Sequence, residues 1–244
     1  MKYLMLLTAL CCSVNLFAQY DGPEWKTPSK ESQAYNEYRN KSTVPPYGLA
    51  KVKALVKSIP WADDETARMD NKTYLALSLR EKFTYVMIHP EISSQNCDPI
   101  PPVQDEDKKI FGRLPDAFSE ANWSERQINF LNSNRDSVMA IIRESVIRSK
   151  RMGVNYKNAI QEINGREMIP FLIDTYNTDK KDHDILSLLM LLMMKSEYTP
   201  FMTSQSYRKL YGPNADFRAY IDFNGANEEL ILKRAADFYS TIRK

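Results

Sequence analysis

Apolar residues recur at helical spacing in four parts of the chain. The four sets are Leu49, Val52, Val56 and Ile59; Leu75, Leu79, Phe83 and Val86; Val138, Ile141, Ile142 and Val146; and Ile231, Ala235, Phe238 and Ile242. A repeat near 3.6 residues places each set on one side of a helix, which predicts four amphipathic helices. The asparagines that precede or open helical segments are predicted N-caps: Asn71, Asn134, Asn155 and Asn224.

Two other segments depart from this pattern. Residues 185–194, ILSLLMLLMM, are apolar on nearly all sides. They are too few to cross a bilayer, which takes roughly 20 residues, so they predict a helix buried on most of its surface. Residues 219–223, AYIDF, are the best strand candidate and stand alone in the sequence.

Glycine is scarce, and its placement supports a helical fold. The chain has seven glycines and thirteen prolines, and the glycines fall between the periodic segments. This distribution is typical of helices joined by short breaks. The predicted fold class is all-α, either stacked helical hairpins of the α-solenoid kind or an irregular helical bundle.

Residues 167–194 resemble one unit of a HEAT-like helical repeat. Pro170 lies in the first predicted helix, an Asp-containing turn follows at residues 179–184, and a leucine-rich second helix comes next. The early arginine of the second helix is missing, and the sequence has no second clear copy, although solenoids need about three stacked repeats. The resemblance implies a pair of packed helices and a surface that binds proteins or peptides.

The first residues have the pattern of an export signal. Lys2 precedes an apolar run at residues 4–18, which ends in Ala18 and is too short for a membrane anchor. We therefore predict cleavage before Gln19, a periplasmic or secreted protein, and no stable membrane insertion afterwards. The predicted organisation is a signal peptide at 1–18, an extended arm at 19–46 and one helical domain at 47–244.

Composition and motifs exclude several kinds of chemistry. The glycines are too far apart for a phosphate-binding loop, and no paired cysteines could hold zinc. The formal net charge of +2 offers no general attraction for nucleic acid. We expect no cofactor and no metal. His183 stands between Asp182 and Asp184, which we interpret as the start of a helix, because adjacent residues point in different directions.

The stretch from His89 to about Ser119 is a long Pro-rich loop. It contains Cys97, the one cysteine left after export, followed by Asp98 and Pro99. A Cys97–His89 nucleophile pair would need a base beside the thiol and a nearby oxyanion hole, but no glycine lies close by. Long ordered loops on a helical scaffold often bind partners, so His89, Cys97 and Asp98 are candidate binding residues.

A basic helix supplies the other candidates for binding. Residues 134–153 carry Arg143, Arg148 and Arg151 and have an excess of positive charge. A solvated helix face explains such a pattern, and an acidic partner would also fit it.

Because the sequence lacks the catalytic motifs that were considered, we infer the class of function by elimination, and two alternatives stay open. We expect a non-catalytic protein-binding module, such as a periplasmic inhibitor or immunity-type protein. One alternative is a hydrolase with a carboxylate pair in a helical cleft, for which residues 63–65 and 105–107 supply acidic clusters. A structural factor in envelope assembly is the other.

Overall fold

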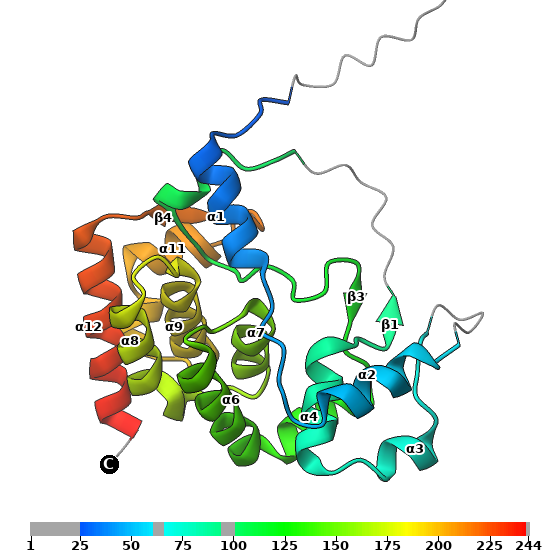
Figure 1. Ribbon diagram of the computed structural model, residues 1–244. Coiled ribbons are helices and arrows are strands. Elements are labelled where there is room, and N and C mark those ends of the chain that lie inside the picture. Colours follow the sequence, from blue (N-terminus) through cyan, green and yellow to red (C-terminus); the bar gives the residue numbers. More distant parts are fainter. Residues whose placement is uncertain (1–24, 61–65, 94–100, 243–244) are drawn as a thin grey trace, which may run out of the picture.

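The computed structural model describes residues 25–60, 66–93 and 101–242, and most of them are helical (Figure 1). The α-helices are α1 (Lys30–Asn40), α2 (Leu49–Lys57), α3 (Asn71–Leu75), α4 (Leu79–Ile88), α5 (Glu125–Ser133), α6 (Arg135–Ser149), α7 (Val154–Glu162), α8 (Ile169–Thr178), α9 (His183–Lys195), α10 (Thr199–Met202), α11 (Gln205–Tyr211) and α12 (Gly225–Ile242). The 3-10 helices are η1 (Glu106–Lys108) and η2 (Arg166–Met168), and the strands are β1 (Ile92–Ser93), β2 (Lys109–Phe111), β3 (Ala121–Asn122) and β4 (Tyr220–Asp222). The predicted all-α class is confirmed.

Helix α9 occupies the centre of the core. Residues 185–193 are all buried, as their apolar sequence predicts, and Leu189 is 0% exposed. The helix packs against α7, α8, α12 and β2. In Figure 1 it lies between α7 and the pair α8 and α12. A helix enclosed in this way positions the charged residues at its first turn deep inside the molecule.

Two small antiparallel ladders cross the helical framework. Strand β2 pairs with β4, with Ile110 opposite Ile221, and β1 pairs with β3. The predicted strand at residues 219–223 is therefore confirmed, although its partner lies about half the chain away. Ladders of two or three residues contain too few positions to show an alternating pattern.

The apolar stripes have different outcomes. The α6 set is entirely buried, and Ile231, Ala235 and Phe238 of α12 are buried as well. The set that begins at Leu75 is wrong as one helix, because α3 ends at Leu75 and that side chain is 70% exposed. Ser78 and Glu81 form a reciprocal capping box that starts α4 afresh.

The predicted caps also differ in outcome. Asn224 accepts a hydrogen bond from the backbone of Asn227, which confirms it as the cap of α12. At α3 the cap is Asp70 and not Asn71. Asn155 lies inside α7, where its carboxamide bonds both backbone groups of Thr43.

The expected extended arm is wrong for residues 30–40, which form α1. Ser29 caps this helix, and Tyr35 and Arg39 are buried on its inner face. The bonds between Asn155 and Thr43 then fix the segment that leads to α2. This helix was missed because polar residues surround its few apolar positions, and its buried face includes an arginine.

The long loop at residues 89–119 contains β1, η1 and β2 within its described part. Cys97 and Asp98, like the predicted signal peptide at 1–18, lie outside the described residues. The two helices of the HEAT-like segment are α8, with Pro170 in its first turn, and α9, and they pack together. No helix in the described ranges is long and apolar enough to span a membrane.

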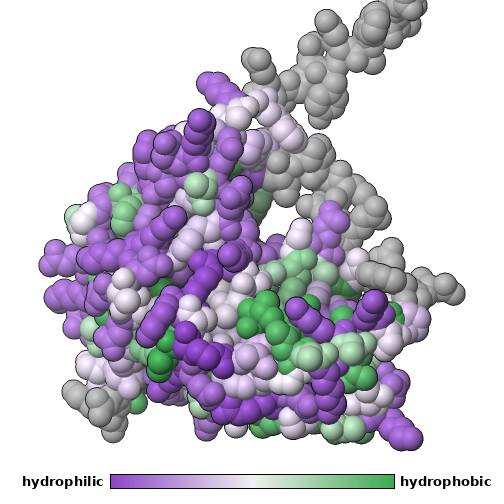
Figure 2. Space-filling model, in the orientation of Figure 1, coloured by the Kyte–Doolittle hydropathy of each residue, from purple (hydrophilic) through white to green (hydrophobic). Residues whose placement is uncertain are grey.

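The surface in Figure 2 is mainly hydrophilic over α1, α8 and α12. Hydrophobic residues gather in that view around α2 and the segment that leads to it. The exposed apolar side chains include Val44 in that segment, and Ile147 on α6 is 59% exposed.

Candidate functional site

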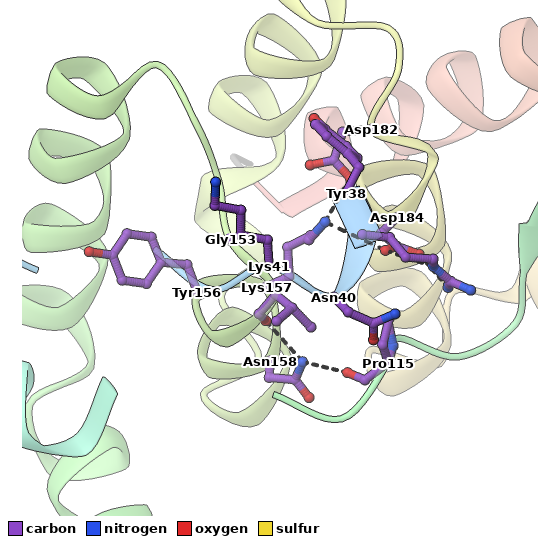
Figure 3. Close-up of polar contacts among 12 residues, drawn as sticks. Tyr38, Asn40, Lys41, Pro115, Gly153, Tyr156, Lys157, Asn158, Asp182 and Asp184 are labelled. Atoms are coloured by element: carbon purple, nitrogen blue, oxygen red, sulfur yellow. Dashed lines mark hydrogen bonds and ion pairs between the residues drawn. The ribbon is translucent and has the colours of Figure 1, made fainter. Parts of the chain in front are cut away.

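A buried network of charges joins α1, α7 and α9 (Figure 3). The Lys157 Nζ lies 2.6 Å from Asp182 Oδ1 and 3.6 Å from Asp184 Oδ2. The guanidinium of Arg39 binds both oxygens of Asp184, at 2.6 Å and 3.2 Å. Glu106 approaches Arg39 from the long loop at 3.4 Å. The network therefore ties together four segments that are distant in sequence.

The positions of these charges follow from local structure. Asp182 precedes the first residue of α9 and Asp184 lies in its first turn, so both carboxylates leave the same end of the central helix. The interpretation of residues 182–184 as the start of a helix is confirmed, because α9 begins at His183, although Asp182 makes no side-chain cap bond. Lys157 projects toward them from α7, with its side chain 0% exposed. Asp182 and Asp184 therefore both form buried ion pairs with Lys157.

Burial and nearby charges shift the pKa values of Asp182 and Asp184 in opposite directions. Burial raises the pKa of Asp182, and the nearby Asp184 carboxylate raises it further, against the Lys157 ammonium. Burial also disfavours the charged form of Asp184, but Lys157 and Arg39 together hold its pKa below the usual range. The Arg39 guanidinium, which bonds both oxygens of Asp184, explains the difference, since a directly bonded opposite charge favours ionisation.

His183, between these acids, packs against two aromatic rings. Its ring stacks on Phe223 with centroids 3.6 Å apart and lies 5.0 Å from the Tyr35 ring. Burial lowers the pKa of His183 to about 4. Within the described residues, no group of three His, Cys, Asp or Glu side chains is placed to hold a metal ion.

A pocket of about 190 Å³ opens beside this network, between α1, α6, α8 and the start of α9. Its apolar walls come from five side chains: Val146, Ile147, Met152, Phe171 and Ile185. Asp182 lines it too, so one carboxylate of the buried network forms part of its surface.

Tyr38 and Arg151 complete the polar side of the pocket. The Tyr38 hydroxyl donates to Asp179 Oδ2 at 2.7 Å, and the Arg151 guanidinium lies 4.3 Å above the Tyr38 ring. Arg151 also donates to the backbone carbonyls of Tyr38 and Lys41. Burial raises the pKa of Tyr38, and the carboxylates of Asp182 and Asp179 add to this effect. The hydroxyl therefore remains protonated and holds Asp179 in place.

A second buried charge cluster lies on the far side of the core. The Glu91 carboxylate accepts hydrogen bonds from Tyr85, Ser124 and Arg126. It joins α4, α5 and the start of β1, which fixes the first residues of the long loop. Burial opposes the charge of Glu91, but these donors hold its pKa below the usual range. The buried position of Glu91 and these contacts indicate a structural role.

The candidate binding residues that were predicted from sequence lie in different parts of the structure and do not form one site. His89 ends α4, where its Nε2 donates to the Ala67 carbonyl at 2.6 Å and its own carbonyl accepts from Gln127. Arg143 donates to the backbone of Glu167, and Arg148 lies near Ser145. Of the predicted residues that the structure describes, Arg151 alone lines the apolar pocket.

Sequence reasoning missed the residues at the centre of the network, namely Arg39 and Lys157. Lys157 had one detectable signal, because it shares a face of α7 with buried apolar residues such as Ile160. A lysine at such a position needs a buried carboxylate partner. The pair of acids around His183 was the available counterpart.

No protein-family model matches the chain, and neither a curated protein nor a solved structure is similar to it.

Proposed function

We propose that this chain is an exported, non-catalytic binding protein that takes a large apolar side chain of a partner protein into the pocket between α1, α6, α8 and α9. The observation that carries the proposal is the combination of apolar walls with polar groups that are already engaged. Asp182 is bound to Lys157, and Asp179 to Tyr38. Such a site can bind a ligand through its shape and through apolar contacts. The fixed carboxylates of Asp182 and Asp179 restrict the orientation of the ligand.

The size of the pocket suits one side chain. A cavity of roughly 150 Å³ holds a benzene molecule, so about 190 Å³ is enough for a phenyl ring or a leucine side chain. The apolar surface continues outward onto Ile147, which is 59% exposed. A partner whose side chain fills the pocket would therefore also cover the exposed part of Ile147.

The edge of the pocket supports a protein as the occupant. Asp174 on α8 and Lys150, directly after α6, line it and are exposed, so the edge has one acid and one base. Apolar centres ringed by polar groups are the usual anatomy of protein interfaces. A backbone on either side of the inserted side chain would find both a hydrogen-bond acceptor and a donor at this edge.

One observation favours the rival hydrolase. Asp182 lines the pocket with a pKa raised by burial, and perturbed carboxyls of this kind are common at active sites. The Lys157 ammonium at 2.6 Å is the counter-argument, because it occupies the carboxylate that a substrate would need. Hydrolysis that is lost in Asp182→Asn while the fold is kept would establish the enzyme.

Export and the finer fold are parts of the same proposal. The apolar run at residues 4–18 supports cleavage before Gln19 and a periplasmic or secreted location, where an inhibitor or immunity-type protein would meet its target. A mature chain that keeps Met1 would contradict this. We also propose that α8 and α9, which pack together, correspond to one HEAT-like hairpin, a kind of unit that binds proteins or peptides.

Site-specific photo-crosslinking tests the binding proposal. A benzophenone amino acid is placed at Ile147, the exposed side chain of the pocket wall, and in a matched chain at Leu75, which is also exposed but lies on α3. We expect a discrete crosslinked protein from Ile147 and none from Leu75. The purified partner should then bind the unmodified chain, and Phe171→Ala should weaken that binding at least about tenfold, or about 1.4 kcal/mol.

A third variant separates the pocket from its surroundings. Thr175→Trp places a bulky ring at the pocket wall and should block the partner without unfolding the helix, because Thr175 is only partly buried. Equal affinity of the partner for this variant and for the native chain would exclude the pocket as the binding site.

A further inference from the structure

A second, larger pocket lies on another side of the molecule, between the segment after β2, α7, α9 and α11. Its volume is about 610 Å³, within the usual range of ligand sites, roughly 300–1,000 Å³. It shares no lining residue with the pocket that is proposed to bind a partner protein. Its lining is mainly polar in character, with Arg113, Asp116, Gln161 and Asp216 among the contributors.

Two tyrosines of α11 supply the aromatic part of this second pocket. Tyr207 and Tyr211 lie one helical turn apart, with ring centroids 5.5 Å apart and planes inclined by 42°. Phe201 packs edge-on against Tyr207 and fixes its ring. Gly112 allows the close packing of Tyr211, because a Cβ there would come within 3.3 Å of that ring.

The Tyr211 hydroxyl is an unused polar group at this site. It is buried and has no hydrogen-bond partner within the described part of the chain. Burial raises the pKa of Tyr211, against the effect of Arg113, so the hydroxyl keeps its proton and can donate. Because this hydroxyl is almost completely enclosed, Tyr211 contributes its ring to the lining of the pocket.

Other groups in the lining are also free to bind. Across the described ranges, the side chains of Arg113, Asp116 and Gln161 have no hydrogen bond or ion pair with another residue. Asn158 uses its amide nitrogen on the carbonyls of Pro115 and Val154, which leaves its oxygen as an acceptor (Figure 3). The pocket therefore presents donors and acceptors together.

The charge balance narrows the class of ligand. One arginine faces two aspartates, so an anion would meet net repulsion and a simple cation would leave Arg113 unpaired. A neutral molecule with many hydroxyls can accept from Arg113, donate to the carboxylates and lay its C–H face on a tyrosine ring. We propose that this pocket binds a neutral saccharide, either free or as the terminal unit of a glycan.

Titration of the full chain with neutral sugars tests this inference. The probes are glucose, galactose, mannose, N-acetylglucosamine and their disaccharides, and saturation-transfer NMR detects binding, with calorimetry for the affinity. We expect saturable binding of at least one sugar at millimolar concentration or below. Arg113→Ala and Tyr207→Ala should each weaken it at least about tenfold, and Tyr211→Ala, which removes the second ring from the lining, should weaken it severalfold.

Matched control variants outside the pocket show whether a loss of sugar affinity is specific to its lining residues. Arg166→Ala removes an exposed arginine outside the pocket and should leave sugar affinity unchanged, as should Phe171→Ala in the other pocket. Circular dichroism checks that each variant folds. Failure of every sugar to bind, or tighter binding of amino acids or dicarboxylates through the same residues, would overturn the assignment. Loss of sugar binding would not affect the proposal that a partner protein occupies the apolar pocket.

Discussion

The Lys157 ammonium lies 2.6 Å from the Asp182 carboxylate, and both side chains are almost completely buried. This pair joins α7 to the start of the central helix at the wall of the apolar pocket. Desolvation of two charges is costly, and it is offset only when both partners are well placed. The position of the pocket wall therefore depends on the Lys157–Asp182 ion pair, and removal of either residue would leave the other charge buried and unpaired, at a large cost in stability.

Replacement of Lys157 by methionine tests that dependence. The variant leaves Asp184 paired with Arg39 and Asp182 buried without its ion-pair partner, and we expect a loss of about 3–5 kcal/mol in the free energy of unfolding. Denaturant unfolding measures the change. Lys72→Met, on the exposed surface of α3, is the control and should change stability by less than about 0.5 kcal/mol.

The double variant Lys157→Met with Asp182→Asn distinguishes pairing from packing. Removal of both charges should restore part of the lost stability, because no unpaired carboxylate remains at Asp182. Strictly additive losses would show that the ammonium contributes by its volume and not through its charge.

His183 should make stability depend on pH in a defined window. Its pKa is about 4 in the folded chain, against a usual 6.5, because burial beside Phe223 and Tyr35 disfavours the charged ring. A depressed pKa stabilises the fold above the unfolded value, and this contribution is lost as pH falls from about 6.5 to about 4. At about 1.4 kcal/mol per pKa unit, the loss is roughly 3 kcal/mol.

The histidine contribution is isolated by comparison with His183→Gln. Unfolding free energies of both chains are measured between neutral pH and about pH 4. The native chain should lose more stability than the variant across this range. The low pKa of Asp184 adds its own loss only below about pH 4, where unfolded aspartate becomes protonated. Parallel pH profiles of the two chains would mean that His183 is solvated.

Leu189 and Leu75 make a matched pair of leucines in helices. Leu189 is fully buried in α9, whereas Leu75 is 70% exposed at the end of α3. Leu189→Ala should cost about 2–5 kcal/mol through lost apolar burial and the cavity left behind. Leu75→Ala should cost less than about 0.5 kcal/mol. Equal effects on the unfolding midpoint would contradict the described packing of α9.

The parts of the fold that sequence predicted are those with strong local signals. Helix α6 has four apolar residues on one face, and α9 is apolar all round, so burial alone determines both. The break at Ser78 was missed because its capping box competes with an apolar stripe that continues across it. Local hydrogen bonds outweighed periodicity there, and Leu75 was left in solvent.

The candidate site was harder to predict because its groups come from four separate segments. Arg39, Glu106, Lys157 and Asp184 converge only when α1, the long loop, α7 and α9 are packed together. Nothing in the spacing of these residues indicates that contact. Arg151 was identified from the basic character of residues 134–153, and its role at Tyr38 depends on the position of α1.

The central claim is that the pocket beside Asp182 receives an apolar side chain, and methyl NMR tests it most directly. Resonances of Ile147, Met152 and Ile185 are followed while blocked leucine, phenylalanine and serine amides are added separately. We expect saturable shifts at these methyl groups with the leucine or phenylalanine compound, none with serine, and none at Leu75 on α3. Unchanged methyl resonances with all three compounds, or equal shifts at Leu75, would contradict the claim.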